Sequence, residues 1–321
     1  MAVNSDKPAR WKEDIGASVD LYNDWFIRFA PETFRATRRE TTGQVEVAFA
    51  QTANLTLLNP DVLSAHPEIL PILRMSTCPP IARDRLIGLS GTSPQLVRCM
   101  ELDKCLPRRL GKAVISSGLV SICKTIDSML DPDILVWRGS SRPPAPGDVH
   151  RAATIIADRL CGSVADPIVR NAQERRQLAA IAAWLTERGY RQVSAGEFEG
   201  LYEMPPSSFA FRLNVPVSLG DGKGKQINIP IDVVVKPHGA DSRSLPVMIE
   251  AKSAGDFTNV NKRRKEEATK MAQLRANYGP SISFALFLCG YFDSGYLGYE
   301  AAEGIDWVWE HRIDDLVGLG I

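Results

Sequence analysis

Two segments in the second half of the chain alternate apolar and polar residues, and they constrain the fold more than any other feature of the sequence. INIPIDVVVK occupies residues 227–236 and LPVMIEAK occupies 245–252, with the polar run PHGADSRS between them. Alternation with a period of two is typical of β-strands, and a short polar connection lets two strands pair antiparallel. In a regular first strand the isoleucines and valines at alternate positions from 227 to 235 share one buried face and Asp232 lies on the other. We therefore predict an antiparallel hairpin with an acidic residue on its more exposed face.

The segments on either side of this hairpin predict further helices and strands. Residues 172–190 carry apolar side chains at helical spacing, and FAFRLNVPVS at 209–218 alternates as a strand before a DGKGK turn. A helix is expected at 261–277, followed by a buried strand at 281–290 that is bounded by proline and glycine. The order helix, strand, strand, strand, helix, strand predicts an α/β (α+β) fold in which helices flank a mixed sheet.

A run rich in proline and glycine, GSSRPPAPGD at 139–148, interrupts the hydrophobic periodicity of the chain. Such a composition favours a linker, because proline and glycine disfavour helix interiors. Before this run the apolar residues recur every three or four positions, which is typical of helices. We predict a mostly helical N-terminal region at 1–138, a linker at 139–150 and a second domain, which contains the sheet, at 151–321.

The hairpin carries three polar side chains that are candidates for chemistry. Glu250 and Lys252 lie two residues apart and therefore share one face of the second strand. If Val234 pairs with Met248, Asp232 lies directly opposite Glu250, with about 5 Å between their Cβ atoms. This register would bring two carboxylates and one ammonium group to the same side of the sheet.

Two carboxylates at such a distance repel each other unless one of them gains a proton or a cation lies nearby. Mg²⁺ suits the need, because it takes hard oxygen ligands from carboxylates, backbone carbonyls and water. We expect Asp232, Glu250 and the backbone carbonyl of Ala251 to bind the metal. Lys252 would orient or help to deprotonate a water molecule that attacks a phosphate group in line. The pattern therefore predicts hydrolysis at phosphorus.

An acid, any residue and a lysine carry little information as an isolated pattern. The chain contains a second copy, DGK at 221–223, in a glycine-rich turn without fixed geometry. The alternative interpretation of Glu250 and Lys252 is a surface ion pair on an exposed sheet face, which contributes little free energy. The upstream Asp232, the hairpin spacing and the helix that follows favour a catalytic site.

These four hairpin residues and the order of the elements resemble the PD-(D/E)xK nuclease superfamily. The chain is also similar to the XamI-type restriction endonucleases, and this similarity is carried by IEAKSAGDFTNVNKRRKEEATKMAQLRANYG at 249–279 and FLCGYFDSGYLGYEAAEGIDWVWEHRIDDL at 287–316. By this resemblance Asp232 and Glu250 are metal ligands, Lys252 is the catalytic lysine, and the fold is restriction-endonuclease-like.

The resemblance also bears on two further positions. Pro230 is displaced by one position from its place in the superfamily motif, a variation that the superfamily tolerates. Many members add an acid from the first helix of the core, and Glu174 is the best candidate for it here. Weaker candidates are Glu197, Glu199 and Glu203.

The function implied by the resemblance is that of a Type II restriction endonuclease. Such an enzyme cuts double-stranded DNA at a short site with Mg²⁺, leaves 5′-phosphate and 3′-hydroxyl ends, and is paired with a DNA methyltransferase that protects the host. A palindromic target favours a homodimer, and the resemblance suggests a GTCGAC-like site. Two alternatives stay open: a repair or structure-specific nuclease of the same superfamily, and a catalytically inactive DNA-binding regulator.

Affinity for DNA must come from local basic patches, because 38 Lys and Arg balance 38 Asp and Glu. One candidate is the run Lys262, Arg263, Arg264 and Lys265, although it could equally be a solvated helix face paired with Glu266 and Glu267.

A second candidate for DNA binding is a helix-turn-helix outline at 81–102 that contains Arg83, Arg85 and Arg98. Ser93 is expected as its N-cap. Seven basic residues against three acidic ones between residues 83 and 112 give this part a net charge of +4. The alternative is an ordinary helical hairpin.

Other classes of protein find no support in the sequence. No stretch approaches the roughly 20 continuous apolar residues that span a bilayer, and the polar start lacks the apolar core of a signal peptide, so we expect a cytoplasmic protein without membrane contact. The six cysteines form no CxxC pair and the four histidines are scattered, which argues against a structural zinc site.

Overall fold

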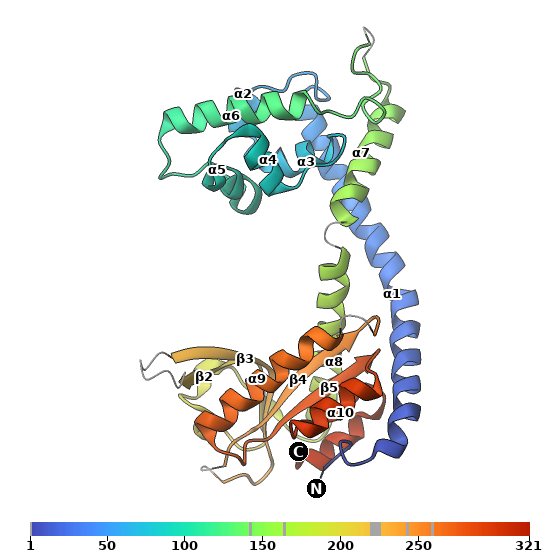
Figure 1. Ribbon diagram of the computed structural model, residues 1–321, viewed down its shortest axis with the longest axis vertical. Coiled ribbons are helices and arrows are strands. Elements are labelled where there is room, and N and C mark those ends of the chain that lie inside the picture. Colours follow the sequence, from blue (N-terminus) through green and yellow to red (C-terminus); the bar gives the residue numbers. More distant parts are fainter. Residues whose placement is uncertain (1, 141–142, 163–164, 219–225, 242–243, 258–259) are drawn as a thin grey trace. The chain divides into compact units, whose positions relative to one another are not determined.

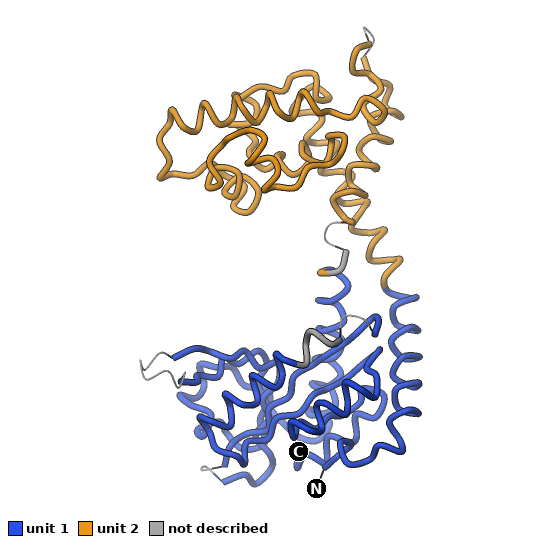
Figure 2. Tube along the Cα trace, in the orientation of Figure 1, with its two compact units in different colours: residues 1–29, 168–321 blue, residues 30–167 orange. Residues whose placement is uncertain are grey.

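The computed structural model describes residues 2–140, 143–162, 165–218, 226–241, 244–257 and 260–321, with the backbone alone at 165–166 and 260–264 (Figure 1). The chain divides into two compact units, one formed by Met1–Phe29 with Ile168–Ile321 and the other by Ala30–Pro167 (Figure 2). The long helix α1, Pro8–Gln51, contributes to both units. The predicted DGKGK turn and its DGK triplet lie outside the described residues.

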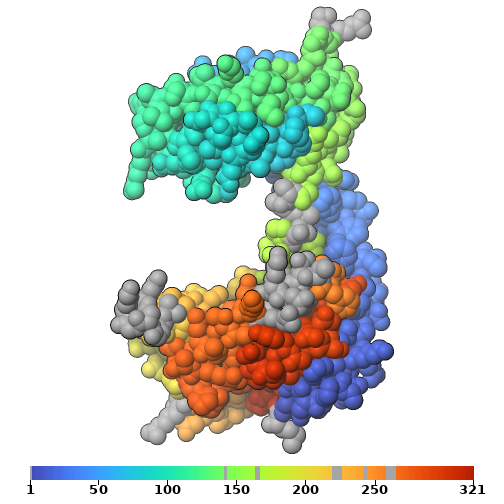
Figure 3. All heavy atoms as spheres, viewed as in Figure 1, coloured from blue at the N-terminus to red at the C-terminus, as the bar shows by residue number. Residues whose placement is uncertain are grey.

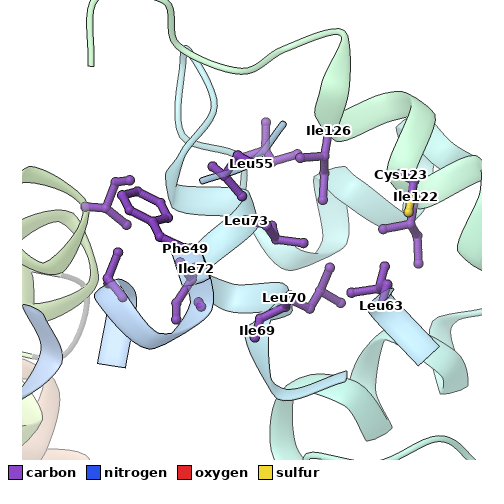
Figure 4. Packing of buried hydrophobic residues seen from close by; sticks show 14 of the residues in the cluster. Phe49, Leu55, Leu63, Ile69, Leu70, Ile72, Leu73, Ile122, Cys123 and Ile126 are labelled. Carbon is purple, nitrogen blue, oxygen red and sulfur yellow. The ribbon is translucent and has the colours of Figure 1, made fainter. Parts of the chain in front are cut away.

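The unit Ala30–Pro167 is helical, as predicted for the N-terminal region. Besides the second part of α1 it contains α2 (Pro60–Ala65), α3 (Leu70–Met75), α4 (Arg83–Ser90), α5 (Pro94–Arg98), α6 (Lys112–Asp127) and α7 (Pro146–Gly162). Their apolar faces meet in one core that includes Phe49, Leu73 and Ile122 (Figure 4). The predicted linker at 139–150 falls within this unit, where α7 already begins at Pro146.

Helices α4 and α5 occupy the segment where the helix-turn-helix outline is expected. Gly91 ends α4 in the left-handed region at φ 61°, which glycine adopts without steric cost, and Pro94 occupies the first turn of α5. Ser93 stands at the predicted N-cap position, but its side chain makes no capping hydrogen bond. The two short helices and their turn are therefore confirmed as local structure.

The other unit is built on a six-stranded mixed sheet in the order β1-β2-β3-β4-β5-β6. The strands are β1 (Arg191–Gln192), β2 (Ser208–Ser218), β3 (Gln226–Lys236), β4 (Val247–Ala254), β5 (Phe284–Gly290) and β6 (Asp306–Trp309). Strands β2, β3 and β4 pair antiparallel, and the remaining pairs are parallel. The predicted α/β class and the order of helices and strands are confirmed, with the short β1 added before the first predicted strand and β6 added after the last.

Helices cover both faces of this sheet. Helix α8 (Ala165–Glu187) packs on one face, and α9 (Val260–Tyr278) and α10 (Ser294–Ala302) pack on the other (Figure 1). The side chains of α9 and α10 form the outer surface over the sheet in the space-filling view (Figure 3). A 3₁₀ segment, Glu310–Leu319, ends the fold.

The prediction that alternate residues of β3, from 227 to 235, share one buried face is wrong. Ile229 and Ile231 pack in the core beneath α9, whereas Val233 and Val235 pack in the core beneath α8. The change of face coincides with Arg212 on β2, whose φ of 52° interrupts the extended backbone. The β2–β3 pairing skips this position, because Phe211 pairs with Val233 and Leu213 pairs with Ile231. Regular alternation thus ends at the residue pair that includes Asp232.

No helix among the described residues is long and apolar enough to cross a membrane. All six cysteines are free thiols.

Candidate active site

Asp232 lies on β3 where the strand pairing is interrupted on one side and ends on the other. The β3–β4 ladder runs from Val235 to Val233, and Val234 pairs with Met248 as predicted. One position further, the carboxylate Oδ2 of Asp232 accepts a hydrogen bond of 2.9 Å from the backbone N–H of Ala251. The side chain therefore continues the link between the two strands where the backbone ladder stops.

The surroundings of Asp232 favour the protonated form of its carboxyl group. Burial, followed by the negative charge of Glu250, raises the pKa of Asp232 to about 6. The hydrogen bond from Ala251 and the charge of Lys252 act in the opposite direction, and Glu174 adds a smaller upward effect. A cation placed at this carboxylate would relieve the repulsion that raises the pKa.

Glu250 and Lys252 occupy the face of β4 that is turned toward α9. The ammonium Nζ of Lys252 donates a 3.1 Å hydrogen bond to Oε1 of Glu250. The side chains of Glu250 and Lys252 are only 6% and 16% exposed, so the alternative of a solvated surface ion pair does not hold. Burial lowers the pKa of Lys252, but Glu250 and Glu267 outweigh burial, so the net direction is upward.

Two charged side chains of α9 complete this cluster, and our sequence analysis did not include them in the site. The Nζ of Lys270 lies 2.6 Å from Oε1 of Glu250 and 3.4 Å from the carbonyl oxygen of Pro230. Oε1 of Glu267 lies 3.0 Å from Nζ of Lys252, and the Glu267 side chain is fully buried. The alternative interpretation, in which Glu267 belongs to a solvated helix face, therefore does not hold for this residue.

A signal for Glu267 was present in the sequence. Glu267, Met271 and Leu274 recur at the spacing of one helix face, and all three are buried in the structure. A carboxylate on an apolar stripe requires a cationic partner, because an unpaired buried charge is costly. The partner could not be named from sequence, since it depends on which strand α9 covers.

The oxygen atoms of this cluster fit a hard divalent cation. Oε2 of Glu250 is buried and makes no hydrogen bond, so it is an acceptor without a donor. The two carboxylates of Asp232 and Glu250 and the backbone oxygens of β4 are the donor type that Mg²⁺ prefers. No three His, Cys, Asp or Glu side chains in the described part of the chain form a metal-binding group. A metal here would thus depend on two carboxylates supplemented by backbone and water.

Glu174, the acid expected from the first helix of the core, lies on α8. Its Oε1 accepts a 2.7 Å hydrogen bond from Arg212, the residue with the left-handed backbone, and its charge contributes to the raised pKa of Asp232. Glu197 is engaged elsewhere, because its carboxylate accepts from the backbone N–H of Ser194 and pairs with Arg191. The other two weaker candidates, Glu199 and Glu203, are exposed.

The predicted DNA-binding residues fall in both compact units. Lys265 is exposed on α9, whereas the side chains of Lys262, Arg263 and Arg264 lie outside the described residues. In the helical unit the exposed residues are Arg85 and Arg98, and Arg83 is partly buried with its Nε 4.0 Å from Asp84. Binding of DNA by these residues stays a prediction.

Comparison with known proteins identifies relatives of this chain. Residues 53–309 match the family model described as XamI restriction endonuclease. Over 318 residues, 99% of each chain, the sequence is 55% identical to the Type II restriction enzyme SalI of Streptomyces albus G. No solved structure gives a significant match.

Proposed function

The chain belongs to the XamI restriction endonuclease family, and from that premise we propose that it cuts double-stranded DNA at a specific site by Mg²⁺-dependent phosphodiester hydrolysis. It is a Type II restriction endonuclease. The observation that carries the proposed chemistry is the cluster at the end of the β3–β4 ladder. There Asp232 accepts a hydrogen bond from the backbone N–H of Ala251, and Glu250 accepts one from the ammonium of Lys252. Acidic oxygens and an ammonium group in one partly buried place are the groups that phosphoryl transfer requires.

Asp232 and Glu250 would hold the metal, with the backbone carbonyl of Ala251 as a further oxygen ligand. When bound, Mg²⁺ acts as a Lewis acid on a phosphate oxygen and lowers the pKa of a coordinated water. The hydrogen bond from the backbone N–H of Ala251 holds the carboxylate of Asp232 beside β4, and the buried Oε2 of Glu250, which makes no hydrogen bond, could accept a ligand. The protein thus contributes a preorganised pair of anionic oxygens.

Lys252 would act on the attacking water and on the charge that develops at phosphorus. Its ammonium is held beside the Glu250 carboxylate and can donate hydrogen bonds to a water molecule or to a phosphate oxygen. Water attacks phosphorus in line, the bond from phosphorus to the 3′ oxygen breaks, and this oxygen takes up a proton. The products are a 5′-phosphate and a 3′-hydroxyl end.

The remaining parts of the proposal follow from the reaction. A palindromic site is cut on both strands most simply by a homodimer with two-fold symmetry. A cognate DNA methyltransferase would protect the host DNA, and both activities would operate in the cytoplasm where the DNA lies. Glu174 is proposed as the additional acid, since its charge already acts on Asp232.

Incubation of the full-length protein with intact plasmid and Mg²⁺ tests the proposed reaction. We expect discrete fragments from a plasmid that carries the GTCGAC-like site implied by the family resemblance. The ends of these fragments should be rejoined by DNA ligase. Cutting of branched DNA alone would favour a repair or structure-specific nuclease. Binding without cutting would favour an inactive regulator.

A further inference from the structure

Helix α9 contributes one buried carboxylate, that of Glu267, to the candidate site. The side chain of Glu267 is 0% exposed and lies on the same helix face as Met271 and Leu274, which belong to the apolar core. An ionised carboxylate in such surroundings loses its hydration, and this loss is compensated only by a nearby cation or by hydrogen bonds. Neither oxygen of Glu267 has a hydrogen bond of regular geometry. Its stability therefore depends on charge.

Lys252 supplies that charge. Its Nζ lies 3.0 Å from Oε1 of Glu267 and 3.1 Å from Oε1 of Glu250, so the ammonium is held between a carboxylate of α9 and a carboxylate of its own strand. Glu250 has a second cation, because Lys270 lies 2.6 Å from the same oxygen. Among the described side chains, Glu267 has Lys252 alone as its ion-pair partner. The two glutamates thus differ in how strongly they depend on Lys252.

We propose that Glu267 is a positioning residue for Lys252. A lysine side chain has four flexible bonds, and an ammonium attracted by Glu250 alone could follow that carboxylate when it binds a metal. The contact with Glu267 fixes the ammonium from the side of α9, where the helix is anchored in the core by Met271 and Leu274. Helix α9 would therefore set the place of the catalytic amine, while β4 supplies the amine itself. This inference rests on the proposed function in so far as Lys252 acts in cleavage.

Unfolding of the full-length protein without metal or DNA tests the dependence of Glu267 on Lys252. We expect Lys252→Met to lower the urea midpoint, because it leaves a buried carboxylate without its cation. Addition of Glu267→Gln to Lys252→Met should raise the midpoint again, since the unpaired charge is removed. Glu266→Gln, a change at the exposed neighbour on the same helix, is the control and should not raise the midpoint when it is added to Lys252→Met. A midpoint of the Lys252→Met, Glu267→Gln variant that is equal to or lower than that of Lys252→Met would overturn the proposal.

Steady-state cleavage tests the positioning role. Glu267→Gln should lower kcat on the order of tenfold to a hundredfold with little change in KM, since a small misplacement of a catalytic group has effects of this size. Glu266→Gln should keep the parent kcat. If Glu267→Gln does not fold, Glu267→Asp keeps the charge on a shorter side chain and should show a partial loss of kcat. An unchanged kcat in the folded variant contradicts positioning, whereas full activity of Lys252→Ala contradicts the proposed function of Lys252 and leaves the unfolding result to decide the ion pair.

Discussion

Asp232 is a carboxyl group of the candidate site whose pKa the fold raises strongly. Burial and the charge of Glu250 raise the pKa of Asp232 from 3.8 to about 6, so the folded protein holds a proton that the unfolded chain has already released. As the pH rises from about 4 to about 6, this difference lowers the free energy of unfolding, and above pH 6 its effect is constant. The decrease should be on the order of 1–3 kcal/mol.

Chemical unfolding of the metal-free protein at a series of pH values measures this effect. The Asp232→Asn variant has no proton to release at this position and should lack the decrease between pH 4 and 6. The same slope in both proteins would show that the carboxyl group of Asp232 does not titrate in the expected way.

Replacement of Lys252 separates binding from chemistry. In the proposed mechanism the ammonium of Lys252 acts on the water and the phosphate and not on the bases, so we expect Lys252→Ala to abolish cleavage and to leave specific DNA binding largely intact. A gel-shift titration and a plasmid digestion, made on the same preparation, measure both properties. Full cleavage by this variant would exclude the lysine from the mechanism.

We expect Lys270 to compete with the proposed metal for Glu250. Its ammonium contacts Oε1 of Glu250 and approaches the carbonyl oxygen of Pro230, which are the kinds of oxygen that a hard cation seeks. Lys270→Met removes this charge, and we expect Mn²⁺ to bind about five- to tenfold more tightly to the protein without DNA. Calorimetric titration measures the affinity. Unchanged or weaker binding would contradict the competition.

The residues of the site were predictable from sequence to the extent that local periodicity places them. Two-residue spacing puts Glu250 and Lys252 on one face, and the register of Val234 with Met248 follows from the hairpin. Glu267 and Lys270 could not be placed in this way, because their role depends on the packing of α9 over β4. That packing is a tertiary contact, and the sequences of the two segments do not indicate that they pack against each other.

At the scale of the elements, the strand at Asp232 departs from the regular pattern. Period-two alternation assumes an extended backbone throughout, and the left-handed conformation of Arg212 breaks this assumption. Arginine has no preference for that conformation, so propensity gives no warning of it. The interruption lies beside Asp232, and unusual backbone of this kind is enriched at functional sites.

Gly290 at the end of β5 tests how tightly the strands next to the site are packed. It has a φ of 101°, and a Cβ atom added there would lie 2.1 Å from the carbonyl oxygen of Ala254. We expect Gly290→Ala to lower the free energy of unfolding by at least about 1–3 kcal/mol, because both strained backbone and a clash with main-chain atoms result. The matched change Gly16→Ala, in α1 where nothing lies within 4 Å, should not destabilise the protein. Equal stability of the two variants would contradict this packing.

At the scale of the whole molecule, the compact units divide the chain at places that composition did not indicate. The predicted linker at 139–150 lies inside the helical unit, and the divisions come after Phe29 and after Pro167. Each division lies next to a proline, since Pro31 is inside α1 and Pro167 is in the first turn of α8. Proline weakens a helix locally without ending its hydrophobic periodicity. Composition and periodicity therefore do not reveal these two divisions of the chain.

The central claim is that Asp232 and Glu250 act together as ligands of one divalent ion. Titration of Mn²⁺ into the parent protein, Asp232→Asn, Glu250→Gln and the double variant, followed by calorimetry, tests this claim directly. We predict binding to the parent, and a loss in each single variant nearly as large as in the double variant, because two ligands of the same ion fail together. Parent-like binding in either single variant, or no binding to the parent, would contradict the account.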